Sequence, residues 1–388
     1  MKKLAIVTTH PIQYYAPVFK LLHERNKISI NVYYTWGEKA LDKYDPGFGQ
    51  KVAWDIPLLD GYPYEWVINI SGDPGTHRFN GIANPNLAEQ INKWQPDAIL
   101  FFGWAYQGHL KAIRYFKNKI PVFFRGDSTL LDEARGIKSL FKTIYLKWVY
   151  KHIDHAFFVG TRNKDYFKKY GLKENQLSFA PHAIDNARFA QDRCSESRLL
   201  RESLNIKSDD LLILFAGKLE NKKSPTLLLE AFLALNSPGI HLLFIGNGVL
   251  ENELKLRSAN TENIHFIPFQ NQSTMPVAYQ AADLFCLPSQ GPGETWGLAV
   301  NEAMACGKAV LVSGKVGCAV DLVKEDYNGA VFRSGQAEDL SAKLAKLTRS
   351  KNVLQEYGHK SKKIIQNWTF QQIAETIENK LNETIRPD

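Results

Sequence analysis

Short apolar runs alternate with longer amphipathic stretches along the first half of the chain. Runs of this length, rich in β-branched and aromatic residues, are typical of buried strands. The strand candidates in this half are residues 4–8, 30–34, 98–102, 122–124 and 155–159. Strands that alternate with amphipathic helices form βαβ units around a parallel sheet. The pattern therefore predicts an α/β domain.

The same alternation restarts after a polar stretch without strand candidates at 186–206, where we expect a linker. Helices are predicted at 224–235 and 298–306. The second set of strand candidates is 211–216, 241–245, 265–267, 284–287, 309–312 and 330–332. Two α/β domains in tandem follow from the periodicity, and a cleft between them is the default ligand site.

Cysteine use and the chain start bear on the compartment. The four cysteines form no C-x-x-C pair and no cluster with zinc-ligand spacing, so we expect neither a disulfide framework nor a zinc site. Only four apolar residues, 4–7, follow the basic start, which is too short for a secretory signal. No apolar run approaches the roughly 18 residues of a membrane span. We expect a cytoplasmic protein, with peripheral contact to the inner face of the plasma membrane as one alternative.

The net charge of +8 is unevenly distributed, because residues 111–173 hold 15 basic and 5 acidic residues. Within this stretch, apolar residues recur at three- and four-residue steps, which predicts a basic amphipathic helix over 135–151. Its basic residues are Arg135, Lys138, Lys142, Lys147 and Lys151. The helix could dock on its own domain, face an anionic acceptor or contact an anionic membrane, where each cation contributes about 1 kcal/mol. Nucleic acid is not expected, because no helix-turn-helix, zinc-finger or RNP signature is present.

A loop rich in glycine and proline, residues 291–297, leads into the helix predicted at 298–306. The first N–H groups of a helix lack intrahelical partners and carry partial positive charge, so this junction could seat a phosphate. Glu294 lies in the loop and Glu302 on the helix. No D-x-D motif accompanies them, so hydroxyl recognition suits these carboxylates better than metal binding. The alternative is an acid that only favours the helix dipole, with a solvated second glutamate.

Basic residues also follow the strand at 211–216. Lys218 comes two residues after it and Lys223 lies at the start of the next helix. Two cations converging on a helix N-terminus could neutralise a diphosphate, although an exposed surface turn would show the same residues. The segment lacks the glycines of a Walker A loop. The short segment 246–248 resembles part of a dinucleotide loop, and a tight turn is the alternative.

Taken together, these segments resemble the retaining glycosyltransferases of family 4, within the group 1 glycosyltransferases, which have the GT-B fold. The resemblance is clearest over 211–335 and weaker before it. Glu294 and Glu302 match the paired glutamates of the E-x7-E motif. The matching segments, in order, are 181–185, 217–224, 246–248, 281–289 and 294–307.

The resemblance implies a GT-B architecture: two Rossmann-like α/β/α domains facing each other across a cleft. We expect an acceptor-binding domain at 1–190 and a nucleotide-sugar-binding domain at 191–365. The stretch 366–388 would form a C-terminal helix that packs back on the first domain.

The resemblance also implies roles for particular residues. Glu302 would hold the nucleotide ribose and Glu294 the donor sugar. Lys218 and Lys223 would stabilise the leaving diphosphate in place of a metal, so no metal or other cofactor is expected. Further donor contacts would come from Gly217, Gly246, Asn247, Thr295, the N–H groups of Gly297 and Leu298, and the main chain at Ile267 and Pro268.

Some residues depart from the family pattern. Lys218 stands where an arginine is usual and loses the bidentate fork of a guanidinium. Ser224 replaces a glycine after the second lysine. Where many members have a histidine, this chain has Asp127, a candidate catalytic residue facing donor and acceptor, or otherwise a turn residue. His10, Gln13 and Arg125 are the predicted acceptor contacts.

The sequence therefore predicts a metal-independent retaining glycosyltransferase with a nucleoside-diphosphate sugar as donor, UDP or GDP being the expected nucleotide. The acceptor would be a saccharide or a lipid-linked saccharide in surface polysaccharide or glycolipid assembly. The alternatives are another GT-B enzyme, such as a nucleotide-sugar epimerase or a phosphorylase, and a non-catalytic sugar-binding protein.

Overall fold

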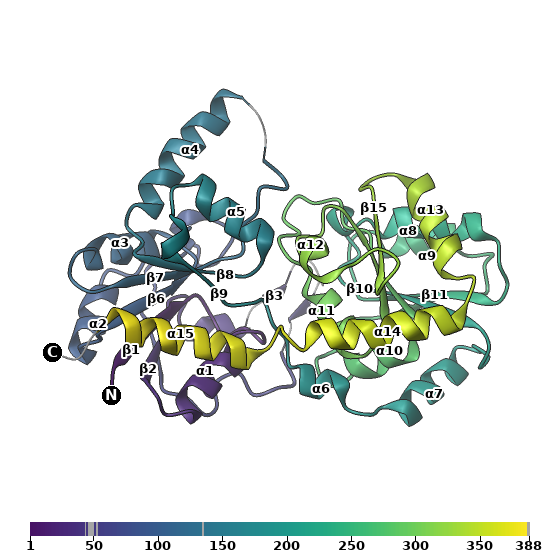
Figure 1. Ribbon diagram of the computed structural model, residues 1–388, viewed down its shortest axis with the longest axis horizontal. Coiled ribbons are helices and arrows are strands. Elements are labelled where there is room, and N and C mark those ends of the chain that lie inside the picture. The colour runs from purple at the N-terminus through teal and green to yellow at the C-terminus, as the bar shows by residue number, and fades with distance from the viewer. Residues whose placement is uncertain (43, 46–49, 52, 134–135, 386–388) are drawn as a thin grey trace. The chain divides into compact units, whose positions relative to one another are not determined.

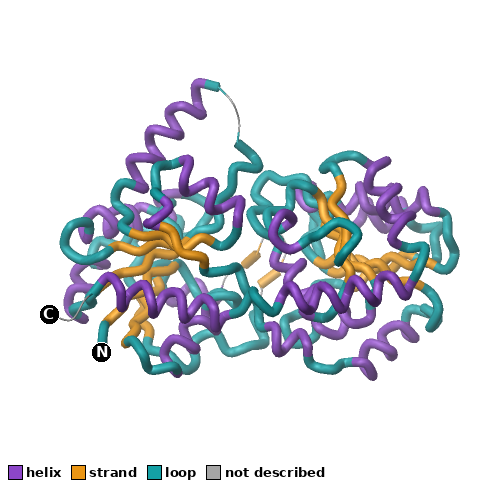
Figure 2. The backbone as a smooth tube through the Cα atoms, viewed as in Figure 1, coloured by secondary structure: helices purple, strands orange, loops and turns teal. Residues whose placement is uncertain are grey.

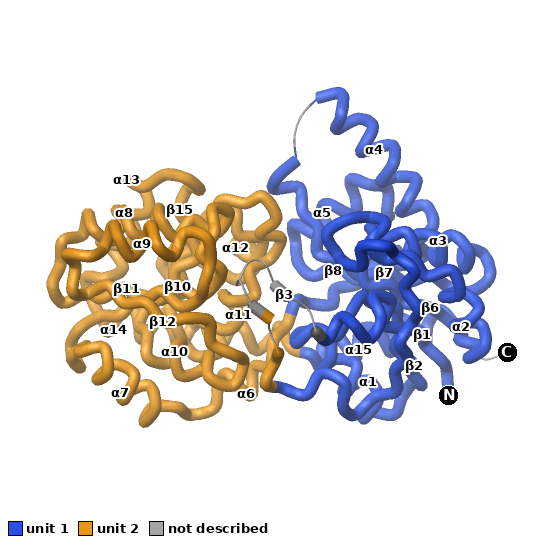
Figure 3. The backbone as a smooth tube through the Cα atoms, turned by 180° about the vertical axis from the view of Figure 1, so that it is seen from behind, with its two compact units in different colours: residues 1–43, 56–182, 370–388 blue, residues 44–55, 183–369 orange. Residues whose placement is uncertain are grey.

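The computed structural model describes residues 1–42, 44–45, 50–51, 53–133 and 136–385. The chain forms two compact units (Figure 3). Unit 1 comprises residues 1–43, 56–182 and 370–388, and unit 2 comprises 44–55 and 183–369. In each unit a layer of parallel strands lies between helices (Figure 2). Both units are Rossmann-like, as predicted.

The sheet of unit 1 has seven parallel strands among the described residues, in the order β5-β2-β1-β6-β7-β8-β9. The strands are β1 (Lys3–Thr8), β2 (Ser29–Tyr34), β5 (Tyr64–Trp66), β6 (Ala98–Phe102), β7 (Val122–Arg125), β8 (His155–Phe158) and β9 (Leu177–Phe179). The five predicted strands are confirmed. The two edge strands β5 and β9 were not predicted, because each is short, only half-buried and interrupted by a polar residue, Glu65 or Ser178.

Helices cover both faces of this sheet (Figure 1). The helices of unit 1 are α1 (Ala16–Glu24), α2 (Leu87–Trp94), α3 (Gln107–Phe116), α4 (Ile137–Tyr150), α5 (Thr161–Lys169) and α15 (Phe370–Thr384). One face packs against α2, α3, α4 and α5 through a core rich in aromatic side chains. On the other face α1 packs against α15, where Arg25 donates two hydrogen bonds of 2.8 and 2.9 Å to the buried Glu378. The C-terminal helix therefore belongs to unit 1.

Unit 2 is built on six parallel strands in the order β12-β11-β10-β13-β14-β15. These are β10 (Leu211–Ala216), β11 (Ile240–Ile245), β12 (Ile264–Ile267), β13 (Leu284–Leu287), β14 (Ala309–Ser313) and β15 (Gly329–Phe332). All six were predicted, because they are largely apolar runs, interrupted by His241 in β11 and His265 in β12. The short strands β3 (Tyr44–Asp45) and β4 (Gln50–Lys51) also group with this unit and pair antiparallel.

Nine described helices accompany this sheet. They are α6 (Asn186–Ala190), α7 (Cys194–Ser203), α8 (Pro225–Leu235), α9 (Glu251–Arg257), α10 (Met275–Ala281), α11 (Leu298–Ala305), α12 (Ala319–Leu322), α13 (Ala337–Leu347) and α14 (Lys351–Ile365). Helices α8, α9 and α13 share one apolar core with the strands. Helices α10 and α11 contact the strands from the other face.

The boundary between the units lies at 182/183, whereas the sequence placed it at 190/191. The predicted linker is largely helical and belongs to unit 2. The amide of Asn186 donates to the carbonyls of Ile365 and Trp368, and the buried Phe189 ring packs edge-on against Tyr279. These short helices carry many polar residues, so the hydrophobic pattern of the sequence did not indicate their contacts with the rest of unit 2.

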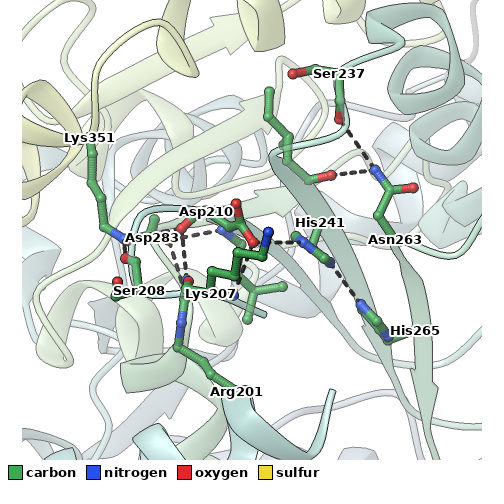
Figure 4. Close-up of polar contacts among 12 residues, drawn as sticks. Arg201, Lys207, Ser208, Asp210, Ser237, His241, Asn263, His265, Asp283 and Lys351 are labelled. Carbon is green, nitrogen blue, oxygen red and sulfur yellow. Dashed lines mark hydrogen bonds and ion pairs between the residues drawn. The ribbon is translucent and has the colours of Figure 1, made fainter. Parts of the chain in front are cut away.

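A polar network fixes α7 at the amino ends of the unit 2 strands (Figure 4). Arg201 donates to Asp283 at 3.3 Å and to the carbonyl of Asp210 at 2.7 Å. The Asp210 carboxylate lies 3.3 Å from His241, which contacts His265 at 3.0 Å. Because the strands are parallel, this network lies at the edge opposite the loops that follow the strands.

Across the described residues, no helix is both long enough and apolar enough to cross a membrane.

His109 on α3 is fully buried in unit 1. Its Nδ1 lies 2.8 Å from the carbonyl oxygen of Gly103, and its Nε2 lies 2.7 Å from the Thr35 hydroxyl. Burial lowers the pKa of His109 to about 4. The side chain therefore joins the loops after β2 and β6 as a neutral ring.

Acidification is expected to destabilise unit 1, because unfolded His109 binds a proton near pH 6.5 while the folded ring resists it. Its contribution is complete above pH 6.5 and is lost as the pH falls toward 4. The full difference in pKa corresponds to about 3 kcal/mol. Urea unfolding at pH 7.5 and 4.5 should show a fall in stability that is about 2 kcal/mol smaller in His109→Gln. Equal falls in both proteins would contradict the assignment.

Candidate functional site

The predicted donor residues of unit 2 gather at the carboxyl edge of its sheet. In the strand order, β10 is followed along the chain by β11 on one side, and β13 lies on its other side. The strand order reverses at this point, and open α/β sheets bind ligands in the crevice outside it. Gly217 and Lys218 follow β10, and the loop carrying Glu294 follows β13. The two loops are joined by the backbone N–H of Gln290, which donates to the carbonyl of Lys222 at 2.9 Å.

Glu294 is buried, at 7% exposure, and its Oε2 oxygen accepts hydrogen bonds from two side chains. The Lys223 ammonium donates to this oxygen in a short ion pair, and the Ser289 hydroxyl donates to it at 2.8 Å. Lys223 ends the short helix η4 (Asn221–Lys223), directly before α8. An anion and a cation thus meet across the point where the strand order reverses.

Glu302 lies in the second turn of α11 and is 5% exposed. The buried Tyr279 hydroxyl, from α10, donates to its Oε2 at 2.8 Å. This bond fixes one carboxylate oxygen. A carboxylate accepts several hydrogen bonds, so Glu302 has the capacity to accept from ligand hydroxyls as well.

The backbone that carries Glu294 is held tightly on both sides. The Glu294 carbonyl accepts from Gly317 N at 3.1 Å, and the Trp296 carbonyl accepts from Cys318 N at 2.9 Å. Gly297 then begins α11 with φ at +98°, and a Cβ there would lie 2.8 Å from a methyl carbon of Val316. Thr295, Gly297 and Leu298 are therefore fixed at the N-terminal end of the helix, where N–H groups can bind an anion.

The loops after β10, β11 and β12 also lie against one another. A Cβ on Gly246 would come within 2.1 Å of the Gly217 carbonyl oxygen, so this close approach requires glycine. Asn247 joins all three loops, because its carbonyl accepts from Leu219 N and its side chain accepts from Phe269 N, at 3.0 and 2.8 Å. Asn247 thus shapes the loop beyond Ile267 and Pro268 through its own side chain.

Ser224, the departure from the family pattern, adopts φ +51° and is buried. The left-handed conformation explains why glycine is usual at this position. Here the hydroxyl donates to the Asn221 carbonyl at 3.1 Å. The loop geometry therefore persists without the glycine.

The predicted acceptor residues of unit 1 lie at the carboxyl edge of that unit's own sheet. His10 follows β1, with its ring edge-on to Trp36 at 5.2 Å, and Gln13 is half-buried in the same loop. Asp127 follows β7, is partly exposed and lies 3.8 Å from Nε2 of His182. These residues surround the switch point between β1 and β6, the second place in the chain where strand order reverses.

Arg125 differs from its predicted role as an acceptor contact. It is 2% exposed, and its guanidinium donates to the carbonyls of Ala180 and Pro181 at 2.6 and 2.8 Å. Burial lowers the pKa of Arg125 to about 10. The side chain therefore holds the segment that leads to His182 and does not present a charge to solvent. We infer that Arg125 positions the site through this segment.

Several residues at these sites were not predicted. Ser289 and Tyr279 hold the two glutamates. Ser289 lies in the matching segment 281–289, five residues before Glu294, but received no role from the sequence, and Tyr279 is 23 residues from Glu302, a separation that carries no signal. In unit 1, Tyr15 stacks on His182 with ring centroids 6.2 Å apart. Burial lowers the pKa of His182, although the neighbouring Asp127 carboxylate acts in the opposite direction. Burial raises the pKa of Tyr15.

No group of three or more His, Cys, Asp and Glu side chains among the described residues is placed to hold a metal ion. Metal independence stays a prediction.

Comparison with known proteins identifies the family. Residues 196–364 match the family model described as glycosyl transferases group 1. This match places the segment 196–364 among the group 1 glycosyltransferases. The resemblance seen in the sequence is thus confirmed at this level, and the matched residues contain Lys218, Lys223, Glu294 and Glu302.

Curated relatives match about half of this chain. The D-inositol 3-phosphate glycosyltransferase of Segniliparus rotundus is 27% identical over 200 residues, covering 49% of this chain and 43% of that protein. The N,N'-diacetylbacillosaminyl-diphospho-undecaprenol alpha-1,3-N-acetylgalactosaminyltransferase of Campylobacter jejuni is 27% identical over 218 residues, covering 55% and 56%. The chain thus spans about half the length of these relatives.

Solved structures show the fold over the whole length. Anabaena HepE in complex with UDP and glucose aligns with a TM-score of 0.72 at 17% identity, covering 99% of this chain and 100% of HepE. WaaG, a glycosyltransferase involved in lipopolysaccharide biosynthesis, aligns with a TM-score of 0.68 at 15% identity, covering 98% and 99%. The chain has the GT-B fold.

Gly297 provides a test of the site's backbone. Gly297→Ala should destabilise unit 2 by about 2–4 kcal/mol, because overpacking adds to a left-handed backbone that alanine disfavours. Gly293→Ala is the matched control, since Gly293 has φ +88° and a Cβ there would meet no atom within 4 Å beyond its chain neighbours. It should cost only about 1–2 kcal/mol. Equal losses in denaturant unfolding would show that the contact with Val316 is not restrictive.

Proposed function

We propose that this chain transfers a sugar from a nucleoside-diphosphate sugar to an acceptor hydroxyl, with retention of anomeric configuration and without a metal. The observation that carries the proposal is the ion pair between Lys223 and the buried Glu294, which lies beside Gly297 at the N-terminal end of α11, at the switch point of unit 2. A cation, helix N–H groups and a carboxylate there suit a diphosphate joined to a polyhydroxylated sugar.

In this proposal Lys218 and Lys223 stabilise the negative charge that develops on the diphosphate as the bond to the anomeric carbon breaks. Glu302 accepts hydrogen bonds from the ribose, and Glu294 from the donor sugar. The acceptor hydroxyl attacks from the face that the diphosphate leaves, and its proton passes to a diphosphate oxygen. No side chain is assigned as a nucleophile.

The acceptor would bind to unit 1, near His10, Gln13 and Asp127. A saccharide or lipid-linked saccharide of surface polysaccharide or glycolipid assembly is the proposed class. The names of the Campylobacter relative and of WaaG, which cite a diphospho-undecaprenol and lipopolysaccharide, support it. A lipid-linked acceptor would bring the chain to the inner face of the plasma membrane, where an anionic membrane is the proposed partner of segment 135–151. Arg135 lies outside the described residues.

Glu302 tests the ribose contact. Glu302→Gln should weaken UDP or GDP binding by about 10- to 100-fold, because hydrogen bonds to a charged acceptor contribute about 1.5–3 kcal/mol. Titration calorimetry with each nucleotide, in the presence of a chelator, measures the effect. Glu338→Gln, at an exposed position of α13, is the control and should bind normally. Unchanged affinity in Glu302→Gln would remove the assignment.

Lys223 tests the role of the cation in transfer. Lys223→Ala should lower kcat by about 100-fold or more, as expected when a donor to the developing charge is lost. Lys222→Ala is a matched control, because the Lys222 side chain pairs instead with Glu220 at 3.3 Å. Product formation from a UDP- or GDP-sugar, with the anomeric configuration read by NMR, gives rate and stereochemistry together. An inverted product would exclude retention. Conversion of the donor without any acceptor would favour an epimerase.

A further inference from the structure

Helix α4 presents an apolar face that its own unit leaves uncovered. Figure 1 shows its N-terminal end standing away from the sheet of unit 1. Only residues of its C-terminal half are buried, namely Leu146, Val149 and Tyr150. The large exposed apolar side chains, which we call the α4 face, are Ile137, Leu140, Phe141, Ile144, Tyr145 and Trp148, between 38% and 77% exposed.

The α4 face is a continuous stripe along the helix. Its members follow one another at steps of three and one residues, so at 100° per residue they occupy an arc of about 140°. Lys138 and Lys147 are exposed and lie at the two margins of this arc, and the exposed Lys142 lies just beyond one margin. No acidic residue occurs in α4. A helix with this arrangement can lie in the plane of an interface, apolar face inward and cations toward the polar side.

The neighbouring helix α3 extends this surface with aromatic rings and cations. The Arg114 guanidinium lies 5.3 Å from the centroid of the Trp148 ring, and Tyr145 stacks against Trp148 at 5.7 Å. Tyr115 is also exposed, with the Lys119 ammonium 3.2 Å from its ring centroid. Tryptophan and tyrosine with basic neighbours are typical of the boundary between lipid headgroups and acyl chains.

We propose that the α4 face docks this chain on an anionic lipid bilayer, with the stripe inserted at the headgroup boundary. Charge complementarity selects this occupant. Residues 111–173 carry 15 basic and 5 acidic residues. Their net charge of +10 exceeds the +8 of the whole chain. A second copy would bring the lysines at the margins against one another. A nucleic acid would leave the apolar stripe exposed, because phosphates cannot cover it.

The docking surface is distinct from the nucleotide site of the proposed function, because it lies on α3 and α4 of unit 1 while the proposed donor residues lie on unit 2. The inference deepens the membrane contact of the proposed function, and its test does not depend on the transfer reaction. A chain that failed to transfer sugar would still bind vesicles if the proposal is right.

Vesicle co-sedimentation of the full-length chain, without substrates, tests the proposal. We expect at least tenfold stronger partitioning onto phosphatidylcholine vesicles containing phosphatidylglycerol than onto phosphatidylcholine alone, and a loss at high salt. The double variant Phe141→Ser with Ile144→Ser should lower partitioning at least tenfold. Both side chains are more than half exposed, so the thermal transition should be unchanged.

The matched control removes two apolar side chains of unit 2 that are even more exposed, as Val249→Ser with Leu256→Ser, at 81% and 79% in the parent. It should bind vesicles like the parent. The proposal is overturned if the parent does not bind anionic vesicles, or if the two double variants lose binding equally. It is also overturned if the Phe141→Ser and Ile144→Ser changes abolish only a concentration-dependent self-association, which would assign the face to a second copy.

Discussion

The ion pair between Lys223 and the buried Glu294 is the interaction on which the candidate site depends. A carboxylate at 7% exposure is tolerated only when a cation or hydrogen-bond donors compensate its lost hydration, and here Lys223 and Ser289 do so. The pair joins the loop after β10 to the loop after β13, at the point where the strand order reverses. Removal of the Lys223 charge would leave the Glu294 carboxylate buried without its cation, so the contact that supports the proposed binding also supports the local fold.

Close backbone approach is the second constraint on the site. The loops after three neighbouring strands pack so tightly that Gly246 has no room for a side chain against Gly217, and Gly297 has none against Val316. Asn247 completes this packing with hydrogen bonds to two of the loops. Rigid loops of this kind hold N–H groups and charges in place before a ligand arrives, which is the condition for electrostatic stabilisation without a large reorganisation.

Unit 1 uses its side chains differently. Its carboxyl edge carries aromatic rings, histidines and Asp127, while Arg125 is drawn inside to hold the main chain near His182. On the surface, α4 keeps an apolar stripe in solvent beside a row of lysines. Leaving apolar side chains in water costs free energy, so an exposed apolar stripe of this kind is consistent with a surface that binds a partner.

The sequence by itself determined the two parallel sheets and most of the donor residues. Eleven strands are largely apolar runs. The glutamates, lysines and glycines of unit 2 occur in local motifs whose order indicates the family. The tertiary structure decided the rest. Edge strands β5 and β9 are short, half-buried and interrupted by a polar residue, so the sequence does not reveal them. Helix α6 joins unit 2 through contacts with residues far along the chain. The inward turn of Arg125, the partners Ser289 and Tyr279, and the exposure of the α4 face depend on distance in space. Hydrophobic periodicity records which positions are apolar, and only packing decides which of them are buried.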